Sequence, residues 1–317
     1  MRKIILDYLN TERVGVLAIE MLDGSPHGAT VHFANCDGPF VFFFETRRAY
    51  RKAEPLLGRE KSRATLVVGT DESKMKSMQL DGVVELIKDS EKELFDSVYL
   101  EKFPEKMTKA VDPTTIYFKF TPTWWRYTDW RHPEGKLIIH SENIDVLDSS
   151  GNKTGEVRTI DDIHWYGLWH SSARVWITNS NGEILLQHRD KSSIEHPDMW
   201  DVSAAGHITA GDDSIGTAIA EVKEELGLDI EHSDLKLIKR MTKNFLSSDG
   251  RFKDNSFEDI YLVNKDVHID DFKMERGEVQ NLKWVTIDQF KKLVKEKNSE
   301  LVPHPDEYEM LLEFFGK

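Results

Sequence analysis

The sequence predicts an α+β protein with two domains, and three observations indicate this class. The chain has 317 residues, more than the roughly 100–200 of a typical single domain. Its first ~130 residues consist mainly of short β-branched and aromatic runs separated by turn residues. The remainder mixes such runs with amphipathic helical patterns, which favours helices packed on a mixed sheet. The polar segment 131–143, with Pro133 and Gly135, predicts a linker between the two halves.

The composition excludes several classes of protein. Hydrophobic residues make up 39% and charged residues 31% of the chain, as in ordinary globular proteins. A net charge of −14 argues against a general nucleic-acid binder, because phosphate backbones require a basic face. No run approaches the roughly 18 apolar residues of a membrane span, and the opening residues do not resemble a signal peptide. Because Cys36 is the one cysteine, an internal disulfide is excluded and we expect a cytoplasmic protein.

The first half is expected to be rich in short strands. The strand-like runs are "RVGVLAIEM", "GATVHFAN", "PFVFFFET", "RATLVVGT", "DGVVELI" and the closing "TIYFKFTPTWWRYTDW". Their β-branched and aromatic residues fit a pleated, half-buried surface. Residues 1–10 and 90–103 carry helical patterns.

The second half is expected to combine a mixed sheet with helices. It opens with two strands around a turn at 148–152, followed by a hairpin at 172–189 with "NSNG" at its tip. A helix should end at Gly227, because glycine readily adopts the left-handed conformation of a helix terminus. Strands at 260–265 and 282–287 and amphipathic helices at 287–298 and 306–317 complete this half.

Three glutamates lie close together on the helix that ends at Gly227. Glu221, Glu224 and Glu225 are spaced i, i+3 and i+4, so their side chains share one helix face. Like charges at this spacing cost roughly 0.2–0.5 kcal/mol per pair. A divalent cation would offset the repulsion, and Mg²⁺ prefers oxygen ligands while keeping water and substrate phosphates in its other positions. A solvated acidic face is the alternative interpretation.

Residues 206–228 resemble the Nudix box, G-x5-E-x7-R-E-U-x-E-E-x-G-U, in which U is aliphatic. Gly206 fits the first glycine, and residues 221–228 fit the terminal block. Two positions depart from the pattern. Asp212 replaces the first Glu and keeps a carboxylate on a shorter stem, whereas Ala220 replaces an Arg that orients the glutamates. The resemblance implies a Nudix α/β/α sandwich over residues 140–317. It also implies a hydrolase that uses Mg²⁺ or Mn²⁺ to cleave the diphosphate linkage of a nucleoside diphosphate derivative.

The same resemblance assigns roles to the carboxylates of this half. Glu221, Glu224 and Glu225 would hold the metal. The general base would be one of these three, or Glu258 or Glu278 from later segments.

The second half also resembles isopentenyl diphosphate isomerase, a relative with the Nudix fold, in "LWHSSARVWITNSNGEILLQHR" and "PDMWDVSAAGH". By this resemblance His170 and His207 fall on metal-ligand positions, and His164 is one residue out of register with a third. Arg189, Gly206 and His207 would contact the substrate.

Two positions argue against isomerase activity. Ala205 replaces the cysteine that the isomerase needs just before its Gly-His pair, and Ser256 replaces the companion glutamate two residues before Glu258. Because an alanine side chain can neither donate nor accept a proton, we expect an isomerase-like Nudix hydrolase rather than an isomerase.

The first half resembles the pyridoxamine 5′-phosphate oxidase-like split β-barrel over residues 1–135, in "PFVFFFETRRAYRKAEPLL", "KSMQLDGVVELI" and the closing strand. Many such relatives bind FMN at a dimer interface, so the resemblance implies a homodimer. The residues that it places at the flavin are Thr46, Arg47, Lys52 and Gln79, with Tyr50 replacing a serine of the phosphate-binding run.

Several functions remain open from the sequence. The intact glutamates favour a hydrolase that acts on a small-molecule nucleotide diphosphate and carries an appended flavin-binding domain. Asp212 and Ala220 instead favour a nucleotide sensor with a non-catalytic Nudix domain. A third interpretation is an FMN-dependent oxidoreductase with an accessory Nudix half, and in a fourth the barrel has lost its flavin and serves only to form the dimer. Flavin absorbance would support the third, and released phosphate or nucleoside monophosphate would support the first.

Overall fold

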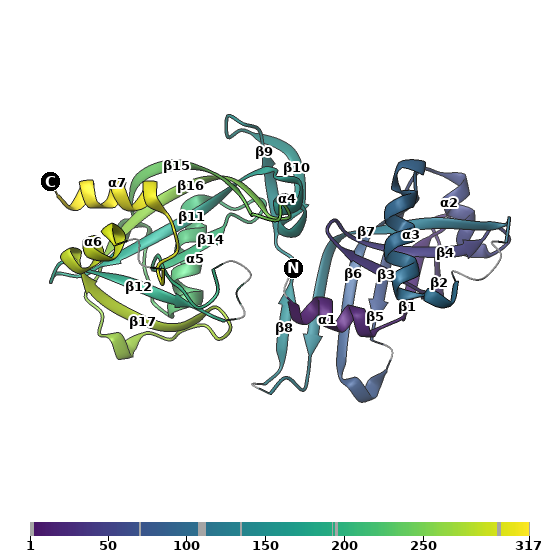
Figure 1. Ribbon diagram of the computed structural model, residues 1–317, viewed down its shortest axis with the longest axis horizontal. Coiled ribbons are helices and arrows are strands. Elements are labelled where there is room, and N and C mark those ends of the chain that lie inside the picture. The colour runs from purple at the N-terminus through teal and green to yellow at the C-terminus, as the bar shows by residue number, and fades with distance from the viewer. Residues whose placement is uncertain are drawn as a thin grey trace. The chain divides into compact units, whose positions relative to one another are not determined.

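The chain forms two compact units in a computed structural model that describes residues 3–316 except 70, 107–111, 134, 192, 194–195 and 297–298. The N-terminal unit comprises residues 3–143 and 158–165, and the C-terminal unit comprises residues 144–157 and 166–316. Figure 1 labels the helices and strands of both units. Parts of the expected helices 1–10, 287–298 and 306–317, of the expected strand 63–70 and of the expected linker lie outside the described residues.

The N-terminal unit is built on one eight-stranded antiparallel sheet with the order β2-β1-β5-β6-β7-β4-β3 and β8 also paired with β7. The strands are β1 (Val14–Glu20), β2 (Pro26–His32), β3 (Ala34–Asp37), β4 (Phe40–Arg47), β5 (Ser62–Val68), β6 (Lys76–Leu86), β7 (Thr115–Asp129) and β8 (Leu137–His140). One edge of β7 pairs with β6, while its other edge pairs first with β4 and then with β8. The sheet therefore curls around β7 into a half-barrel, which confirms the β-rich first half.

Two hydrophobic clusters explain why the "FVFFF" run of β4 is buried on both faces. Phe42 and Phe44 point into the interior of the curled sheet, whereas Phe43 points the other way, with its ring centroid 5.5 Å from that of Phe95 on α3. The segment expected to be a linker carries β8, because Ile139 is buried in the same interior. The helices described here are α1 (Lys3–Thr11), α2 (Glu54–Gly58), α3 (Lys92–Lys102) and α4 (Ile160–Tyr166).

The C-terminal unit is built on a nine-stranded mixed sheet. Its strands are β9 (Asn143–Leu147), β10 (Lys153–Thr159), β11 (Trp169–Thr178), β12 (Glu183–Arg189), β13 (Trp200–Asp201), β14 (Ala204–His207), β15 (Lys236–Leu246), β16 (Lys253–Asn264) and β17 (Val279–Thr286). Its helices are α5 (Ser214–Leu226), α6 (Ile287–Lys295) and α7 (Pro305–Phe315). β11 and β12 pair beside their connecting turn, and further along β11 pairs with β14 while β12 pairs with β13. The short strands β13 and β14 therefore lie where the two long strands separate.

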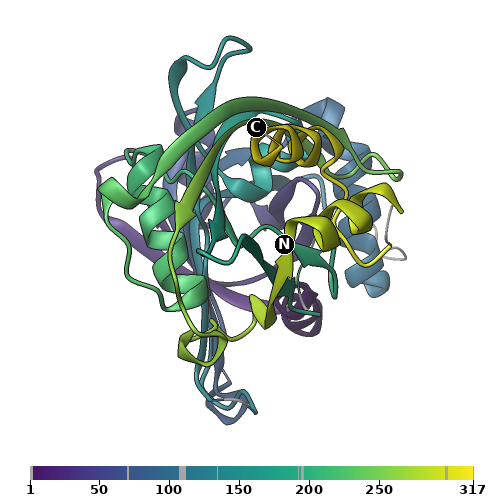
Figure 2. The same cartoon turned by 90° about the vertical axis from the view of Figure 1, so that its left-hand side faces the viewer.

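Helices cover both faces of this sheet, as Figures 1 and 2 show for α5 on one side and for α6 and α7 on the other. Alternating residues of β11 serve the two faces. Ala173, Val175 and Ile177 pack with α5, whereas Trp176 packs with α6 and α7. Because both faces are covered, the stretch of β11 from Ala173 to Ile177 is apolar apart from Arg174. The arrangement confirms the expected α/β/α sandwich.

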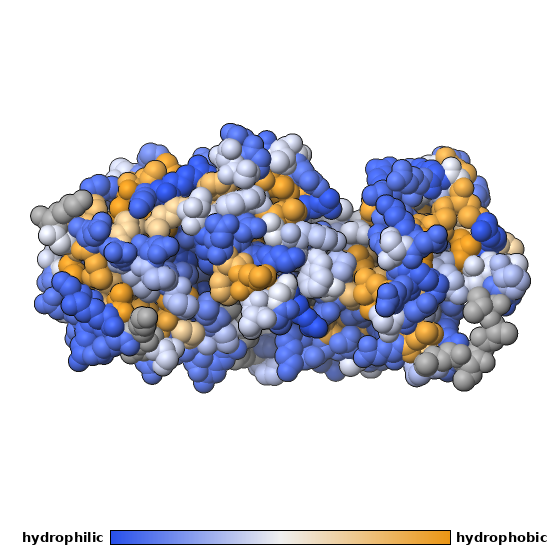
Figure 3. Space-filling view, turned by 45° about the horizontal axis from the view of Figure 1, so that its top comes forward, coloured by the Kyte–Doolittle hydropathy of each residue, from blue (hydrophilic) through white to orange (hydrophobic). Residues whose placement is uncertain are grey.

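No helix of the described chain is both long enough and apolar enough to cross a membrane. On the face drawn in Figure 3, apolar side chains form scattered patches among hydrophilic ones. Exposed apolar side chains scattered in this way are normal for a folded protein.

Candidate active site

The carboxylate-bearing helix is α5, and the local sequence fixes both of its ends. Asp213 is the N-cap residue, and its side chain accepts a hydrogen bond from the Gly216 N–H at 2.7 Å. Gly227 follows the helix with a φ of 67°, a left-handed conformation that few other residues adopt without cost. The Nudix-like stretch therefore sets where the helix begins and ends, and so where its glutamates lie.

The three glutamates differ in burial although they share a helix face. Glu225 is 8% exposed, Glu221 is half-buried and Glu224 is exposed. Glu221 and Glu224 line a cleft of about 460 Å³. The other residues lining it are His207, Thr209, Gly211, Asp212, Asp213, Gly216, Thr217 and Ala220. Both departures from the Nudix box therefore face this cleft, where alanine leaves space that an arginine side chain would occupy.

Glu225 is the buried carboxyl group of the three. Burial raises its pKa well above the usual range, and the nearby charges of Glu221 and Glu278 raise it further. Its Oε2 atom accepts hydrogen bonds from the Ala205 N–H and from Nε2 of Gln187, each at 3.3 Å. A bound cation would reverse this balance, because positive charge favours the carboxylate form. This set of oxygen donors therefore fits a hard divalent cation such as Mg²⁺ or Mn²⁺.

Gly206 allows the side chain of Glu221 to approach β14. A Cβ atom at position 206 would lie 1.8 Å from Oε1 of Glu221, far inside van der Waals contact. Gly206 pairs with Ala173 of β11, so the ladder restricts its movement away from the carboxylate. The first glycine of the box is thus explained by close approach.

His170 and His207 lie side by side on neighbouring strands. Their ring centroids are 5.4 Å apart, and a ring nitrogen of one lies within 4.8 Å of a ring nitrogen of the other. His170 is 1% exposed, and burial together with the charge of His207 lowers its pKa to about 4. Its imidazole is therefore neutral near pH 7, the form that binds metals. His164 lies on α4, in the segment grouped with the N-terminal unit.

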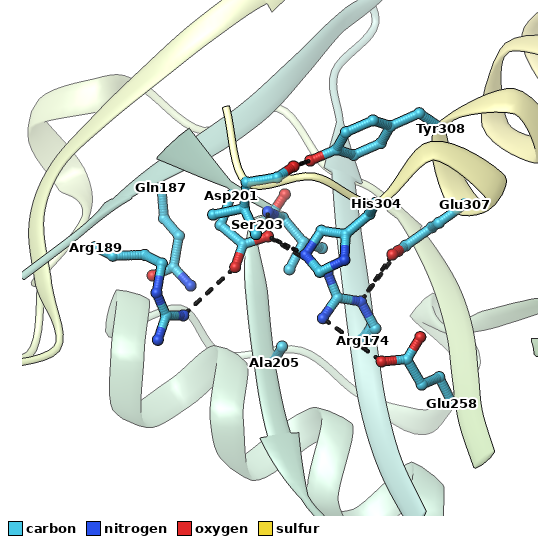
Figure 4. Close-up of polar contacts among 12 residues, drawn as sticks. Arg174, Gln187, Arg189, Asp201, Ser203, Ala205, Glu258, His304, Glu307 and Tyr308 are labelled. Carbon is cyan, nitrogen blue, oxygen red and sulfur yellow. Dashed lines mark hydrogen bonds and ion pairs between the residues drawn. The ribbon is translucent and has the colours of Figure 1, made fainter. Parts of the chain in front are cut away.

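Glu258 and Glu278, the two later candidate bases, have different surroundings. Glu258 is buried on β16, and its Oε1 lies 4.0 Å from Nη1 of Arg174, as Figure 4 shows. The negative charges of Asp254 and Glu258 raise the pKa of Lys243, and they outweigh burial, which lowers that pKa. Glu258 therefore lies among cations, whereas Glu278 lies close enough to Glu225 to affect its pKa.

Arg189 lies at the end of β12, near the Nudix glutamates. Its Nη1 is 3.4 Å from Oδ2 of Asp201. Burial and neighbouring carboxylates raise the pKa of Glu225, and the positive charge of the Arg189 guanidinium offsets part of that rise. A phosphate group bound by Arg189 would thus lie near the candidate metal ligands.

A group of buried charged and polar residues beside the candidate site was not predicted from the sequence. They are Arg174, Asp201, His304 and Glu307, which Figure 4 shows between β11, β13 and α7. One signal was present: Arg174 interrupts the apolar run of a strand, and a buried charge requires a partner. The partners could not be named, because Glu307 lies 133 positions away in the chain.

The residues expected at a flavin lie partly together. Thr46 ends the buried part of β4, is 5% exposed, and its Oγ1 has no hydrogen-bond partner among the described residues. Lys52 follows on a short turn, where burial lowers the pKa of its ammonium. It forms no ion pair with a described residue, and its Nζ lies 5.8 Å from the ring centroid of Tyr50. Arg47 is more exposed and pairs with Asp112 at 3.3 Å. A buried hydroxyl and a partly buried cation without an anion fit a phosphate group.

Gln79 lies away from the candidate phosphate site formed by Thr46 and Lys52. Thr46 pairs with Ile116 and Gln79 pairs with Arg126, so the two lie ten positions apart along β7. Ten residues of extended strand span about 33 Å when straight. The register of one sheet therefore does not place Gln79 beside Thr46.

Comparisons with known proteins agree with this geometry. A family model described as a NUDIX domain matches residues 168–304, and one described as pyridoxamine 5′-phosphate oxidase matches residues 1–129. Nudix hydrolase 3 from Arabidopsis thaliana is 32% identical over 166 residues, which is 51% of this chain and 22% of that protein. An uncharacterized Nudix hydrolase from Clostridium acetobutylicum is 30% identical over 162 residues, 50% of this chain and 77% of that protein.

The isomerase resemblance is also found, at lower identity. An isopentenyl-diphosphate Delta-isomerase from Serratia proteamaculans is 26% identical over 121 residues, which is 38% of this chain and 65% of that protein. Through its C-terminal half this chain belongs to the Nudix hydrolase family, and its N-terminal half, which the pyridoxamine 5′-phosphate oxidase model matches, is a curled antiparallel sheet similar to that family's split barrel.

Proposed function

We propose that the protein is a metal-dependent hydrolase that cleaves the diphosphate linkage of a nucleoside diphosphate derivative. The observation that carries this is the placement of three carboxylates on one face of α5, where Glu221 and Glu224 line the cleft of about 460 Å³ and Glu225 is buried. Such a concentration of carboxyl groups is unfavourable unless a cation joins it. Arg189 supplies a phosphate-binding cation next to the same group.

Each residue then has a chemical task. Glu221, Glu224 and Glu225 would hold Mg²⁺ or Mn²⁺, and His170 and His207 are the further candidate ligands. When bound, the metal neutralises phosphate oxygens and orients the attacking water. Gly206 keeps Glu221 in place by leaving it room.

The general base is one of the three Nudix glutamates, or Glu258 or Glu278, and between the last two the surroundings favour Glu278. A base must be free to accept a proton, and the Glu258 carboxylate is already engaged by the Arg174 guanidinium, whose Nη1 lies 4.0 Å from its Oε1. Glu278 lies instead with the other carboxylates. Replacing the true base by glutamine should lower kcat more than replacing the other, and the two single variants separate the candidates.

A substrate panel tests the proposed activity. Nucleoside diphosphates, dinucleotides, nucleotide sugars and prenyl diphosphates are incubated with the full chain and Mg²⁺ or Mn²⁺, and released phosphate and nucleoside monophosphate are measured. Metal-dependent turnover of at least one compound is expected, and turnover should stop with EDTA. Binding of a nucleotide without turnover by any metal form would instead support the nucleotide sensor.

Isomerisation of isopentenyl diphosphate is expected to be absent. Ala205 offers only a methyl group, and its N–H is used in the hydrogen bond to Glu225. No proton donor thus stands where the isomerase has its cysteine. Product analysis with isopentenyl diphosphate and each metal checks this, and steady formation of the dimethylallyl isomer would contradict it.

We also propose that the N-terminal unit binds FMN in a homodimer. The buried Thr46 hydroxyl and the partly buried Lys52 support a phosphate site. Because Gln79 lies ten positions along β7 from Thr46, a dimer in which each copy contributes one of them to a flavin fits this register. Two-fold dimers are the commonest closed assembly. Flavin-dependent oxidation or reduction of a substrate would extend the proposal to an oxidoreductase.

A further inference from the structure

Asp201 is a buried carboxylate held from several sides. It is 4% exposed. Its Oδ1 accepts hydrogen bonds from the Val202 N–H at 2.8 Å, from Nη2 of Arg174 at 3.3 Å and, when that nitrogen carries the proton, from Nε2 of His304 at 3.1 Å. Several donors fixed to different elements leave the carboxylate little freedom to rotate.

The second oxygen of Asp201 faces the candidate phosphate-binding arginine. Oδ2 lies 3.4 Å from Nη1 of Arg189, and Figure 4 shows this contact on the side opposite His304. The side chain of Arg189 is 26% exposed, whereas that of Arg174 is 8% exposed. The carboxylate therefore joins a buried, structural arginine to a partly accessible one.

Glu307 provides a natural comparison on the other side of Arg174. It is 3% exposed, its Oε2 lies 2.9 Å from Nε of Arg174, and its Oε1 accepts a hydrogen bond from the Trp176 ring N–H at 2.7 Å. Asp201 and Glu307 are thus both buried carboxylates paired with Arg174. Among the contacts described, Asp201 reaches Arg189 and Glu307 does not.

From this geometry we infer that Asp201 is a positioning residue: it holds the Arg189 guanidinium toward the Nudix carboxylates and the substrate diphosphate, and α7 contributes through His304. The inference rests on the proposed function, because it assigns Asp201 a role in binding the same substrate. An arginine side chain loses conformational entropy when it binds a phosphate. A carboxylate that already fixes its orientation in the free protein reduces this entropy cost of binding. Asp201 should therefore act on substrate affinity rather than on the chemical step.

The test compares Asp201→Asn with Glu307→Gln in the full chain, on a substrate found in the panel, with folding monitored by circular dichroism. Both variants should lower thermal stability, because each weakens a pair with Arg174. Asp201→Asn should raise KM about tenfold with kcat nearly unchanged, whereas Glu307→Gln should leave KM within about twofold. Equal effects of the two variants on KM would overturn the inference, since they would show a general structural role.

The Arg189→Ala background separates this inference from the proposed function. If Arg189 binds the substrate and Asp201 acts through it, Arg189→Ala raises KM and Asp201→Asn adds nothing to that rise. A full additional rise in the double variant overturns the positioning role while leaving Arg189 in the site. If Arg189→Ala alone leaves KM unchanged, Arg189 does not bind the substrate diphosphate. The positioning role of Asp201 and the assignment of Arg189 in the proposed function would then both be wrong.

His304→Leu keeps the test decisive if Asp201→Asn does not fold. It removes one donor to Oδ1 of Asp201 and leaves the contact with Arg189 in place. A smaller rise in KM, about threefold, is expected, and it too should vanish in the Arg189→Ala background. An unchanged KM in a folded His304→Leu variant would contradict the contribution of α7.

Discussion

Glu225→Gln is expected to lower hydrolysis by about 100-fold or more while leaving the chain folded. Glutamine keeps the shape of the side chain but loses the negative charge that a divalent cation requires of its ligand. Turnover with saturating Mg²⁺ or Mn²⁺ gives the measurement. Glu309→Gln, which removes a carboxylate from an exposed position on α7, serves as the control and should retain full activity.

The same substitution should stabilise the metal-free protein at neutral pH. Because the folded-state pKa of Glu225 is raised, its contribution becomes unfavourable as pH rises through the unfolded value of about 4.3. Glutamine does not titrate, so Glu225→Gln should raise the Tm in EDTA at pH 7 and lose the stabilisation that added metal gives the parent chain. Unchanged turnover in both Glu225→Gln and Glu224→Gln would reject the metal assignment.

The loss of hydrolysis and the raised Tm expected for Glu225→Gln both depend on the position of α5, which could be predicted from the sequence. The spacing of Glu221, Glu224 and Glu225 places them on one helix face, and Gly227 marks the helix end, because both depend on local geometry alone. Their unequal burial could not be predicted in the same way. It depends on β14, whose Ala205 N–H meets Glu225 and whose Gly206 faces Glu221.

The polar group around Asp201 shows where sequence patterns fail. Arg174, Asp201 and Glu307 come from a strand, a short strand and the last helix, and no local spacing relates them. Each looks like an ordinary charged residue until the fold closes around it. The strand β8 within the expected linker could not be predicted for a similar reason, because its polar flanks dominate the local pattern while Ile139 reaches the barrel core. Long-range packing therefore determines which charged or apolar side chains matter.

Lys52→Glu is expected to abolish FMN binding by the N-terminal unit. The ammonium of Lys52 is partly buried, which lowers its pKa, and it has no ionic partner among the described residues. Burial removes part of the hydration of this ammonium, and a flavin phosphate would replace the lost hydration with a favourable ionic interaction. A carboxylate at this position would instead repel the phosphate, and the repulsion is stronger than in water because the site is partly desolvated. Titration of FMN into the full chain, followed by quenching of flavin fluorescence, measures the loss.

Lys3→Glu makes the same charge change at an exposed residue in the first turn of α1 and should bind FMN like the parent chain. Retained FMN affinity in Lys52→Glu, or equal loss in Lys3→Glu, would show that the phosphate does not lie at Lys52. Absence of FMN binding by the parent chain would remove the flavin role of the barrel altogether. Diphosphate hydrolysis should be the same in all three proteins, because the proposed hydrolytic residues belong to the C-terminal unit. A parallel loss of hydrolysis in Lys52→Glu would instead reveal coupling between the two activities.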